Sequence, residues 1–459
     1  MNTFFKLLLS FLLCLAPGMI KAQGVYKEKV ICESNPKHSY ALYLPKGYDE
    51  SKTWPVLFLF AASGQGQIGV QVFKEAADQY GFILAGSYNY KNGPLGVGYE
   101  AASILIREVS TQYAIDPSRV YTGGMSGGAR MASTLAVSSD KIAGVIAIGA
   151  VFNHLNYPKE QASFDLIGIS GDKDMNYREM PAAMRIMRER FRFAHTIVYD
   201  GKHHWCSPKQ AREALAWLDM MASVRGIKAN DQDYENQFKS ERLARADSLI
   251  KAGELVAAHD LLESLALVEQ ARDHAESLGR LKVLKSQKDY RKQRKQMDRV
   301  MNKELQREME ARKAFVQISM VTQSDSVYRW WETRIGQYRR ESKKAKTPEA
   351  RNSATRTLGF IGLQCFSTGS NYLYSQQWSL ALPIYKVAAL INPDHADVNY
   401  LMAKLYALNG QEDRSLSFKE KAMKAGFTRP DGSTEITAKR LTDTAEFQWL
   451  GWRVVRATF

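Results

Sequence analysis

Short apolar runs alternate with longer helical stretches along the first half of the chain. The short runs are rich in β-branched residues and have the length of strands, whereas the longer stretches repeat apolar positions at helical spacing. The run Val-Leu-Phe-Leu-Phe at residues 56–60 is apolar without alternation, as expected of a strand buried on both faces. This pattern predicts an α/β domain with a mostly parallel sheet covered by helices. The expected strands are 29–33, 40–44, 56–60, 82–87, 120–123, 144–148, 166–170 and 196–199, and the expected helices are near 70–80, 98–113, 127–138, 178–192 and 208–222.

The pattern changes after Arg225. The next eight residues, 226–233, are polar and break the periodicity, and beyond them prolines are scarce and helix formers dominate. We therefore predict an α/β domain at residues 23–225, a linker at 226–233, a helical region at 234–358 and a further helical domain at 359–459.

Small and aromatic residues recur at a fixed spacing within the helical half. Three pairs are each 34 residues apart: Gly369 with Ala403, Tyr372 with Tyr406, and Ala388 with Ala422. The stretch resembles the tetratricopeptide repeat, a helix pair in which small residues let the two helices approach and aromatic residues fill the gap between neighbouring pairs. The resemblance implies an all-α repeat domain at 359–459, and a weaker copy starts at Ala246. An irregular helical bundle is the alternative.

The N-terminus has the pattern of an export signal. A positively charged start with Lys6 leads into an apolar run at residues 7–16, and a short tail ends at Ala22. The run is shorter than the ~20 residues that a membrane-spanning helix needs, which argues against an uncleaved anchor. We therefore expect a signal peptide at residues 1–22 and an exported protein, periplasmic or secreted, with no membrane span after cleavage.

The expected mature chain keeps three cysteines: Cys32, Cys206 and Cys365. Export implies an oxidising compartment, in which at most one disulfide can form among three thiols. The pair Cys32 and Cys206 is favoured because both residues belong to the α/β domain.

The positive charge is concentrated in one helical stretch. The formal net charge is +15, and residues 280–313 alone hold thirteen Lys or Arg against five Asp or Glu. Because no nucleic-acid-binding signature accompanies this stretch, we interpret it as the solvated face of a long helix and expect no nucleic-acid partner. No cluster of His, Cys, Asp and Glu has the spacing of metal ligands, so we expect neither a metal nor a cofactor.

The strongest chemical motif is Gly-Met-Ser-Gly-Gly at residues 124–128. It follows an apolar strand and leads directly into a helix of small residues, which is the context of a nucleophile elbow. Gly124 and Gly128 suit a turn that is too tight for larger flanking side chains. Ser126 then projects from the sheet edge at the start of a helix, whose amide groups favour a developing negative charge. Ser126 is therefore the candidate nucleophile.

A serine nucleophile needs a base to take its proton and a carboxylate to orient that base. In α/β domains that carry a nucleophile elbow, the chain order is Ser, then Asp or Glu, then His. One later expected strand ends in a loop with Asp172 and Asp174, and another ends in a loop with His203 and His204. Position within these loops favours Asp174 and His203, with Asp172 and His204 as alternatives. A helix cap by the aspartates and a solvated pair of histidines are the non-catalytic interpretations.

With these motifs, the α/β domain resembles the secreted α/β-hydrolase esterases related to polyhydroxybutyrate depolymerases and feruloyl esterases. The matching segments are Tyr-Leu-Pro-Lys-Gly-Tyr at 43–48, Ile-Asp-Pro-Ser-Arg-Val-Tyr at 115–121, the Gly-x-x-Asp turn at 171–174 and Gly-x-His-x-Trp at 201–205. The resemblance implies an α/β-hydrolase fold with Ser126 as nucleophile, Asp174 as orienting acid and His203 as general base.

The loop expected to form the oxyanion hole departs from these relatives. They carry His-Gly after the third strand, whereas this chain reads Ala-Ala-Ser-Gly at residues 61–64. The donors of such a hole are backbone amides, which alanine supplies as well as glycine does. We expect donors from Ala61 or Ala62 and from Gly127. Met125 and Trp205 are candidates for the substrate pocket, and simple packing of the loop aromatic is the equal alternative for Trp205.

These residues predict an exported serine hydrolase that cleaves carboxylic esters through an acyl-enzyme. The resemblance implies feruloyl or acetyl esters of polysaccharides, or aliphatic polyesters, as substrates. Two alternatives stay open: a serine peptidase on the same fold, and a weakly active or inactive domain whose helical repeats serve as an interaction or sensor module. Stacked helix pairs present concave surfaces, so we expect a protein or peptide partner, or self-association, at the repeats. If the two halves are independent, deletion of the region after Arg225 leaves ester hydrolysis intact.

Overall fold

The computed structural model describes residues 23–454 except 153–157, 159–161, 191, 271–274, 321–324, 448 and 451–452. The expected signal peptide at residues 1–22 lies outside the described residues. Among the helices that the structure describes, none is long and apolar enough to cross a membrane.

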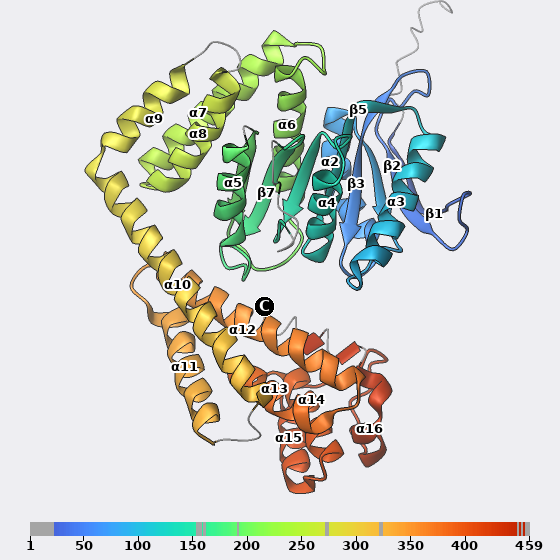
Figure 1. Ribbon diagram of the computed structural model, residues 1–459, viewed down its shortest axis with the longest axis vertical. Coiled ribbons are helices and arrows are strands. Elements are labelled where there is room, and N and C mark those ends of the chain that lie inside the picture. The colour runs from blue at the N-terminus through green and yellow to red at the C-terminus, as the bar shows by residue number, and fades with distance from the viewer. Residues whose placement is uncertain are drawn as a thin grey trace, which may run out of the picture. The chain divides into compact units, whose positions relative to one another are not determined.

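An eight-stranded sheet with flanking helices forms the N-terminal half of the chain (Figure 1). Its strand order is β1-β2-β4-β3-β5-β6-β7-β8. Strand β2 pairs antiparallel with β1 and β4, whereas β3 pairs parallel with β4 and β5, and β5 pairs parallel with β6. The strands are β1 (Val25–Ile31), β2 (Ser39–Leu44), β3 (Trp54–Ala61), β4 (Ile83–Ser87), β5 (Ile115–Met125), β6 (Gly144–Ile148), β7 (Asp165–Gly171) and β8 (Ala194–Tyr199).

The flanking helices pack in pairs: α2 lies against α6, and α3 lies against α4. This mostly parallel sheet between helices is the α/β-hydrolase fold, so the predicted fold class is confirmed. The helices are α2 (Gly66–Tyr80), α3 (Leu95–Gln112), α4 (Gly127–Val137), α5 (Glu179–Glu189) and α6 (Pro208–Val224).

The centre of the sheet explains its most apolar sequence. Strand β3 lies between β4 and β5, and every side chain from Val56 to Phe60 is fully buried. A strand that is covered on both faces has no solvent side on which polar residues could alternate. The prediction that residues 56–60 form a strand buried on both faces is confirmed.

Chain contacts divide the protein into two compact units. The first consists of Met1–Ile167, Met187–Phe193 and Trp205–Asp231, and the second of Gly168–Ile186, Ala194–His204 and Gln232–Phe459. Strand β8, the end of β7 from Gly168 and the segments that follow both strands therefore group with the helical half of the chain. The domain boundaries drawn from the sequence stay a prediction.

After the α/β half, the described chain is helical. Helix α10 carries most of the basic stretch, and most of its Lys and Arg side chains are exposed, as expected of a solvated helix face. The helices are α7 (Gln232–Lys251), α8 (Leu255–Gln270), α9 (Glu276–Ser286), α10 (Lys288–Met320), α11 (Asp325–Lys344), α12 (Pro348–Tyr374), α13 (Trp378–Ile391), α14 (Ala396–Leu408), α15 (Glu412–Lys424) and α16 (Ala438–Thr442), followed by a short 3₁₀ turn, η1 (Thr444–Glu446).

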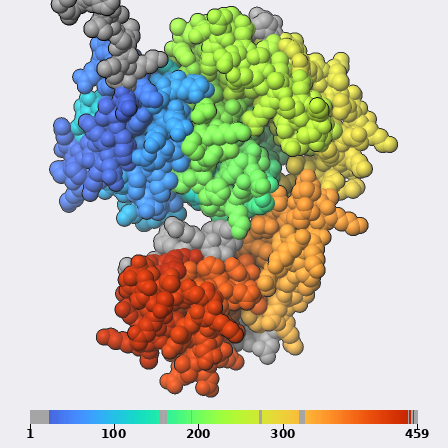
Figure 2. Space-filling view, turned by 180° about the vertical axis from the view of Figure 1, so that it is seen from behind, coloured from blue at the N-terminus to red at the C-terminus, as the bar shows by residue number. Residues whose placement is uncertain are grey.

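The C-terminal helices share one hydrophobic core and form a rounded lobe, orange to red in Figure 2. Helix α12 packs on α13, α13 on α14, and α14 on α15. A Cβ atom on Gly369 would lie 2.5 Å from the ring of Tyr385, so the α12–α13 contact requires a residue without a side chain there. The assignment to the tetratricopeptide repeat stays a prediction.

The expected disulfide is wrong. Cys32, Cys206 and Cys365 are all free and buried. Cys32 follows β1 near Glu108 of α3, whereas Cys206 precedes α6, the helix that packs on α2. Cys32 therefore lies beside the α3–α4 helix pair, and Cys206 beside the α2–α6 helix pair. Burial raises the pKa of Cys32 to about 11 and that of Cys206 to about 12, so both stay protonated near neutral pH.

Candidate active site

Ser126 stands in a strained turn between β5 and α4. Its backbone has φ 58° and ψ −119°, a conformation that residues with a side chain rarely adopt. The amide of Ser126 donates a hydrogen bond of 2.8 Å to the carbonyl of Ile148 at the end of β6. Ser126 precedes the first residue of α4, so the positive end of the helix dipole lies beside it.

The two elbow glycines are required by close backbone packing. A Cβ atom on Gly124 would lie 2.4 Å from the carbonyl oxygen of Phe60, and one on Gly128 would lie 1.9 Å from the same oxygen. Strand pairing places Phe60 opposite Gly124 and Ala61 opposite Met125. The turn at Ser126 is therefore pressed against the end of β3, where the expected oxyanion loop begins.

The expected oxyanion donors lie beside the loop that follows β4. Ala61 ends β3, and the carbonyl of Ala62 accepts a hydrogen bond of 2.9 Å from the amide of Asn92. The hydroxyl of Tyr90 donates to the carbonyl of Gly127 at 2.7 Å. Burial raises the pKa of Tyr90 to about 12, so its hydroxyl keeps the proton that it donates.

Tyr90 and Asn92 thus brace both sides of the expected oxyanion hole. A Cβ atom on Gly127 would lie 1.8 Å from Oδ1 of Asn92, so the Asn92 side chain covers this end of the elbow. Both residues follow β4. The usable sequence signal was the polar stretch directly after a buried parallel strand, because such strand ends carry binding and catalytic loops.

The structure brings Asp174 and His203 together. Nδ1 of His203 lies 2.9 Å from each carboxylate oxygen of Asp174. The Asp174 side chain is 1% exposed and that of His203 is 8% exposed. Backbone hydrogen bonds from Asp172 to Tyr199 and from Lys173 to Gly201, each 2.9 Å, join the two loops that carry the pair.

The alternatives to this pair have other partners. Oδ1 of Asp172 accepts a hydrogen bond of 3.1 Å from the amide of Gly201, and Oδ2 accepts one of 2.7 Å from Asn352. His204 is exposed and its Nδ1 lies 3.5 Å from the hydroxyl of Tyr199. In this geometry Asp174, not Asp172, holds a histidine, and that histidine is His203.

A pocket of about 160 Å³ opens beside His203. Residues of the two strand-end loops form one wall and residues of the helical half form the other, and all of them belong to the second unit. The lining combines apolar and polar side chains: Lys173, Met175, Lys202 and His203 on the loop side, and Ser342, Thr355, Leu358, Gly359, Ile391 and Asn392 on the helical side.

The two residues expected in a substrate pocket are half-buried. Met125 ends β5 directly before Ser126. The ring of Trp205 lies close to α2, because a Cβ atom on Gly69 would be 3.0 Å from its Cη2 atom. Trp205 is thus a packed aromatic in the first unit, and its role toward a substrate stays a prediction.

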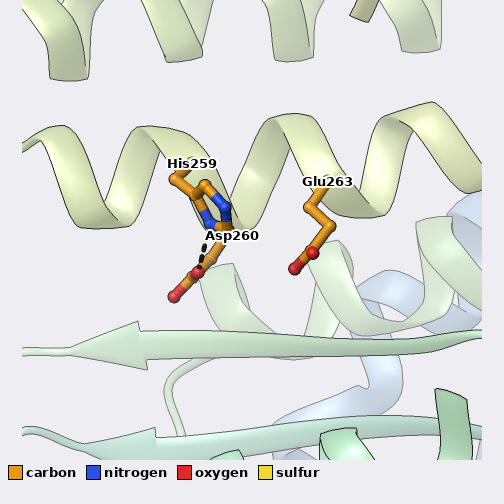
Figure 3. Close-up of side chains that lie close together, drawn as sticks. All are labelled: His259, Asp260 and Glu263. Atoms are coloured by element: carbon orange, nitrogen blue, oxygen red, sulfur yellow. Dashed lines mark hydrogen bonds and ion pairs between the residues drawn. The ribbon is translucent and has the colours of Figure 1, made fainter. Parts of the chain in front are cut away.

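Among the described residues, one group of side chains has ligand atoms close enough together to hold a metal ion: His259, Asp260 and Glu263 on α8 (Figure 3). Nδ1 of His259 is 2.9 Å from a carboxylate oxygen of Asp260, and the imidazole stacks on Tyr290 with ring centroids 5.2 Å apart. Arg294 lies 4.0 Å from the same Asp260 oxygen and already supplies a positive charge. Packing and ion pairing account for this arrangement.

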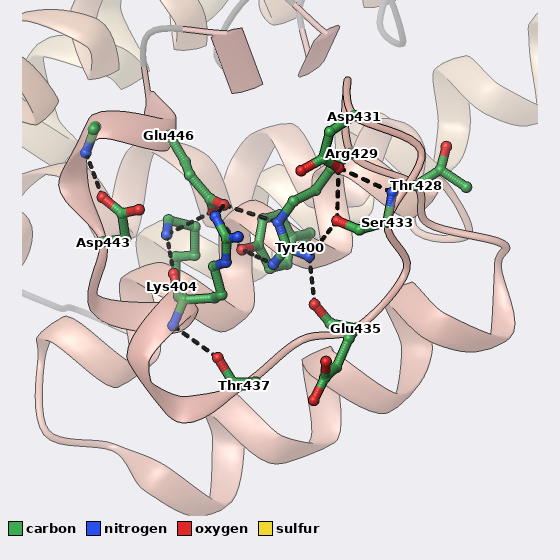
Figure 4. Close-up of polar contacts among 12 residues, drawn as sticks. Tyr400, Lys404, Thr428, Arg429, Asp431, Ser433, Glu435, Thr437, Asp443 and Glu446 are labelled. Carbon is green, nitrogen blue, oxygen red and sulfur yellow. Dashed lines mark hydrogen bonds and ion pairs between the residues drawn. The ribbon is translucent and has the colours of Figure 1, made fainter.

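A buried polar cluster lies in the C-terminal lobe (Figure 4). The carboxylate of Glu446 accepts hydrogen bonds from Arg429 at 2.9 Å, from Lys404 at 3.1 Å and from the hydroxyl of Tyr400. All four side chains are buried. Burial alone would raise the pKa of Glu446, but the hydrogen bonds from Tyr400 and Arg429 and the charge of Lys404 outweigh burial and hold the pKa below its usual value.

Comparison with known proteins finds similar solved structures only. No family model and no curated protein matches the chain. A hyperthermophilic esterase from the archaeon Pyrobaculum calidifontis is similar in structure, with 13% identity, coverage of 44% of this chain and 86% of that chain, and a TM-score of 0.36. An S-formylglutathione hydrolase from Staphylococcus aureus has 13% identity and a TM-score of 0.35, and the match covers 43% of this chain and 100% of that chain. A ferulic acid esterase has 15% identity and a TM-score of 0.35, and the match covers 43% of this chain and 97% of that chain. At such identities the likeness concerns the fold alone.

The strain at Ser126 gives a first prediction. A residue with a side chain is strained by about 1–3 kcal/mol in this backbone conformation, whereas glycine is not. Glycine lowers the free energy of unfolding by about 0.4–1 kcal/mol relative to alanine, because it gives the unfolded chain more conformational freedom. We expect Ser126→Gly to be about 1 kcal/mol more stable than Ser126→Ala in urea unfolding. An alanine variant at least as stable as the glycine variant would show that the turn is relaxed.

The Glu446 cluster gives a second prediction. Glu446→Gln leaves Arg429 and Lys404 without a counter-charge, which should cost about 3 kcal/mol near neutral pH. Because the folded pKa of Glu446 is lowered, its contribution to stability is complete above the unfolded value of 4.5 and is lost as the pH falls through the folded pKa. The stability difference between the parent and variant proteins, from urea unfolding of the C-terminal lobe, should therefore shrink from neutral pH toward about pH 3. A difference that stays constant over this range contradicts the assignment.

Proposed function

We propose that this protein is a serine hydrolase that cleaves carboxylic esters, with Ser126 as nucleophile, His203 as general base and Asp174 as orienting acid. The observation that carries the proposal is the hydrogen-bonded pair of Asp174 and His203, which follows the order expected from the sequence. The three residues follow the ends of β5, β7 and β8, which belong to one sheet. Ligand and catalytic groups of α/β sheets gather at such strand ends.

Each side chain has a defined task in this mechanism. Nδ1 of His203 is engaged by Asp174, so Nε2 is the ring nitrogen that takes the proton of Ser126. The Ser126 oxygen attacks the ester carbonyl and forms a tetrahedral oxyanion. His203 then gives its proton to the leaving alcohol, and an acyl-enzyme remains. Water, deprotonated by His203, attacks the acyl-enzyme and releases the acid.

Backbone amides hold the oxyanion in this proposal. Gly127 supplies one amide from the start of α4, and Ala61 or Ala62 supplies the other. The strained turn at Ser126 and the packing of both elbow glycines on Phe60 support this role, because they fix the elbow against the loop that starts at Ala61. Removal of one such donor typically costs about 10²–10³ in turnover.

The proposed substrates follow from the resemblance of the sequence to secreted esterases. They are feruloyl or acetyl esters of polysaccharides, or aliphatic polyesters, met by an exported enzyme after removal of residues 1–22. The proposed partner of the C-terminal helical repeats is a protein or peptide. Two competing functions make different predictions: a serine peptidase would cleave anilides, and an inactive sensor domain would not react at all.

Labelling with a fluorophosphonate tests the nucleophile. We expect the protein to be labelled, and Ser126→Ala and His203→Ala to lower the labelling rate by about 10⁴-fold or more. His204→Ala is the matched control, since this neighbouring histidine is exposed, and it should react like the parent protein. Labelling that persists in Ser126→Ala, or none in the folded parent, would refute the proposal.

A substrate panel tests the reaction class. We expect turnover of p-nitrophenyl acetate to exceed that of long-chain p-nitrophenyl esters, with activity on methyl ferulate or acetylated xylan and none on peptide p-nitroanilides. Steady-state kcat/KM values for each substrate provide the measurement. A preference for anilides would instead support the peptidase.

A further inference from the structure

Helix α12 contacts the loop that carries Asp174 through two side chains one helical turn apart. Asn352 donates a hydrogen bond of 2.7 Å to Oδ2 of Asp172, and Nη1 of Arg356 donates one of 2.6 Å to the carbonyl of Asp172. Residues four apart lie on the same face of a helix, so this face of α12 is turned toward the loop. All three residues belong to the second unit.

Arg356 is fixed from behind by a buried carboxylate. Its Nε lies 2.9 and 3.1 Å from the two carboxylate oxygens of Glu304 on α10. Glu304 is 0% exposed and Arg356 is 4% exposed. The guanidinium also lies 4.6 Å from the ring centroid of Tyr177, in the same segment as Asp174. A planar guanidinium with this many partners has one orientation, which makes it a rigid support.

Asp172 connects this support with both members of the catalytic pair. Its Oδ1 accepts the hydrogen bond of 3.1 Å from the amide of Gly201, two residues before His203. Asp172 itself is two residues before Asp174. One carboxylate therefore joins the acid loop, the base loop and α12, and Nζ of Lys173 lies 3.9 Å from its Oδ1 atom.

Apolar packing continues the same contact. Met175 is 5% exposed and belongs to the hydrophobic cluster that contains Leu358 and Ile361 of α12. Thr355 and Leu358 also line the pocket beside His203. The face of α12 that holds the acid loop is thus also a wall of that pocket.

We infer that Asn352 and Arg356 are positioning residues for the Asp174–His203 pair and that they act through Asp172. The inference rests on the proposed function, because it assigns the helical half a part in the same reaction. It also answers the question of whether the halves are independent: the helices supply contacts that the catalytic loops need, so loss of these helices impairs ester hydrolysis.

The test is the turnover of Asn352→Ala and Asn352→Asp, each normalised to the number of reactive serines. A fluorophosphonate titrates the competent sites, and p-nitrophenyl acetate then gives kcat per titrated site and KM. We expect kcat per site to fall by about tenfold to 100-fold with KM little changed, because a small displacement of catalytic groups costs about that much. The aspartate variant keeps the size of Asn352, lacks its donor and repels Asp172.

Two comparisons make the result decisive. Asn371→Ala, an exposed asparagine on the same helix, should keep the parent kcat per site. Arg356→Lys keeps a positive charge beside Glu304, but one ammonium lacks the planar fork that reaches both Glu304 and Asp172, so it should show the same loss as Asn352→Ala. It provides the readout if the Asn352 variants fail to fold.

A purely structural role predicts another pattern: fewer titratable sites, each with the parent kcat. That result, or parent values throughout, overturns the inference while Ser126-dependent labelling continues to support the hydrolase. Absence of Ser126-dependent labelling in the parent protein refutes the hydrolase itself, so the two failures are distinguishable.

Discussion

The carboxylate of Asp172 is the contact that joins the segments carrying the proposed catalytic pair, Asp174 and His203. It accepts hydrogen bonds from Gly201 in the base loop and from Asn352 in α12, and it sits two residues before Asp174. A charged group of this kind is held in place only where several donors compensate its lost hydration. Asp172 therefore joins three segments that are far apart in sequence, and two of them carry Asp174 and His203, which are hydrogen-bonded to each other.

A different constraint fixes Ser126. Its positive φ is an unfavourable conformation that persists only where the surroundings leave no alternative. Here Gly124 and Gly128 are pressed on the carbonyl of Phe60, and the Ser126 amide is bonded to Ile148, so the central strands of the sheet impose the turn. The fully buried β3 is what makes that support rigid, because a close-packed core transmits strain and does not yield to it.

The sequence was informative where a feature is local. The strand at 56–60, the elbow around Ser126 and the order of Asp174 and His203 each follow from a pattern of a few neighbouring residues. Position in the loop favoured Asp174 over Asp172, but only the structure shows what lies across from each carboxylate: His203 for Asp174, and Gly201 and Asn352 for Asp172. Arg356 is 184 residues from its partner Asp172, and no periodicity or motif links positions that far apart. The Cys32–Cys206 pairing was wrong for a related reason: membership of one domain says nothing about distance between two side chains.

The sequence pattern of the basic stretch indicated the exposed face of α10 but not the acidic residues on its buried face. Its Lys and Arg residues on α10 face solvent for the most part, as their pattern indicates. Two of its few acids turn inward instead. Glu304 holds Arg356, and Glu308 lies 3.0 Å from Arg178, just beyond the acid loop. Burial raises the pKa of Glu308 and the charge of Arg178 opposes this, as expected of an ion pair away from water. Helix α10 thus turns most of its basic side chains to solvent, while two of its carboxylates pair with arginines beside the loop that carries Asp174.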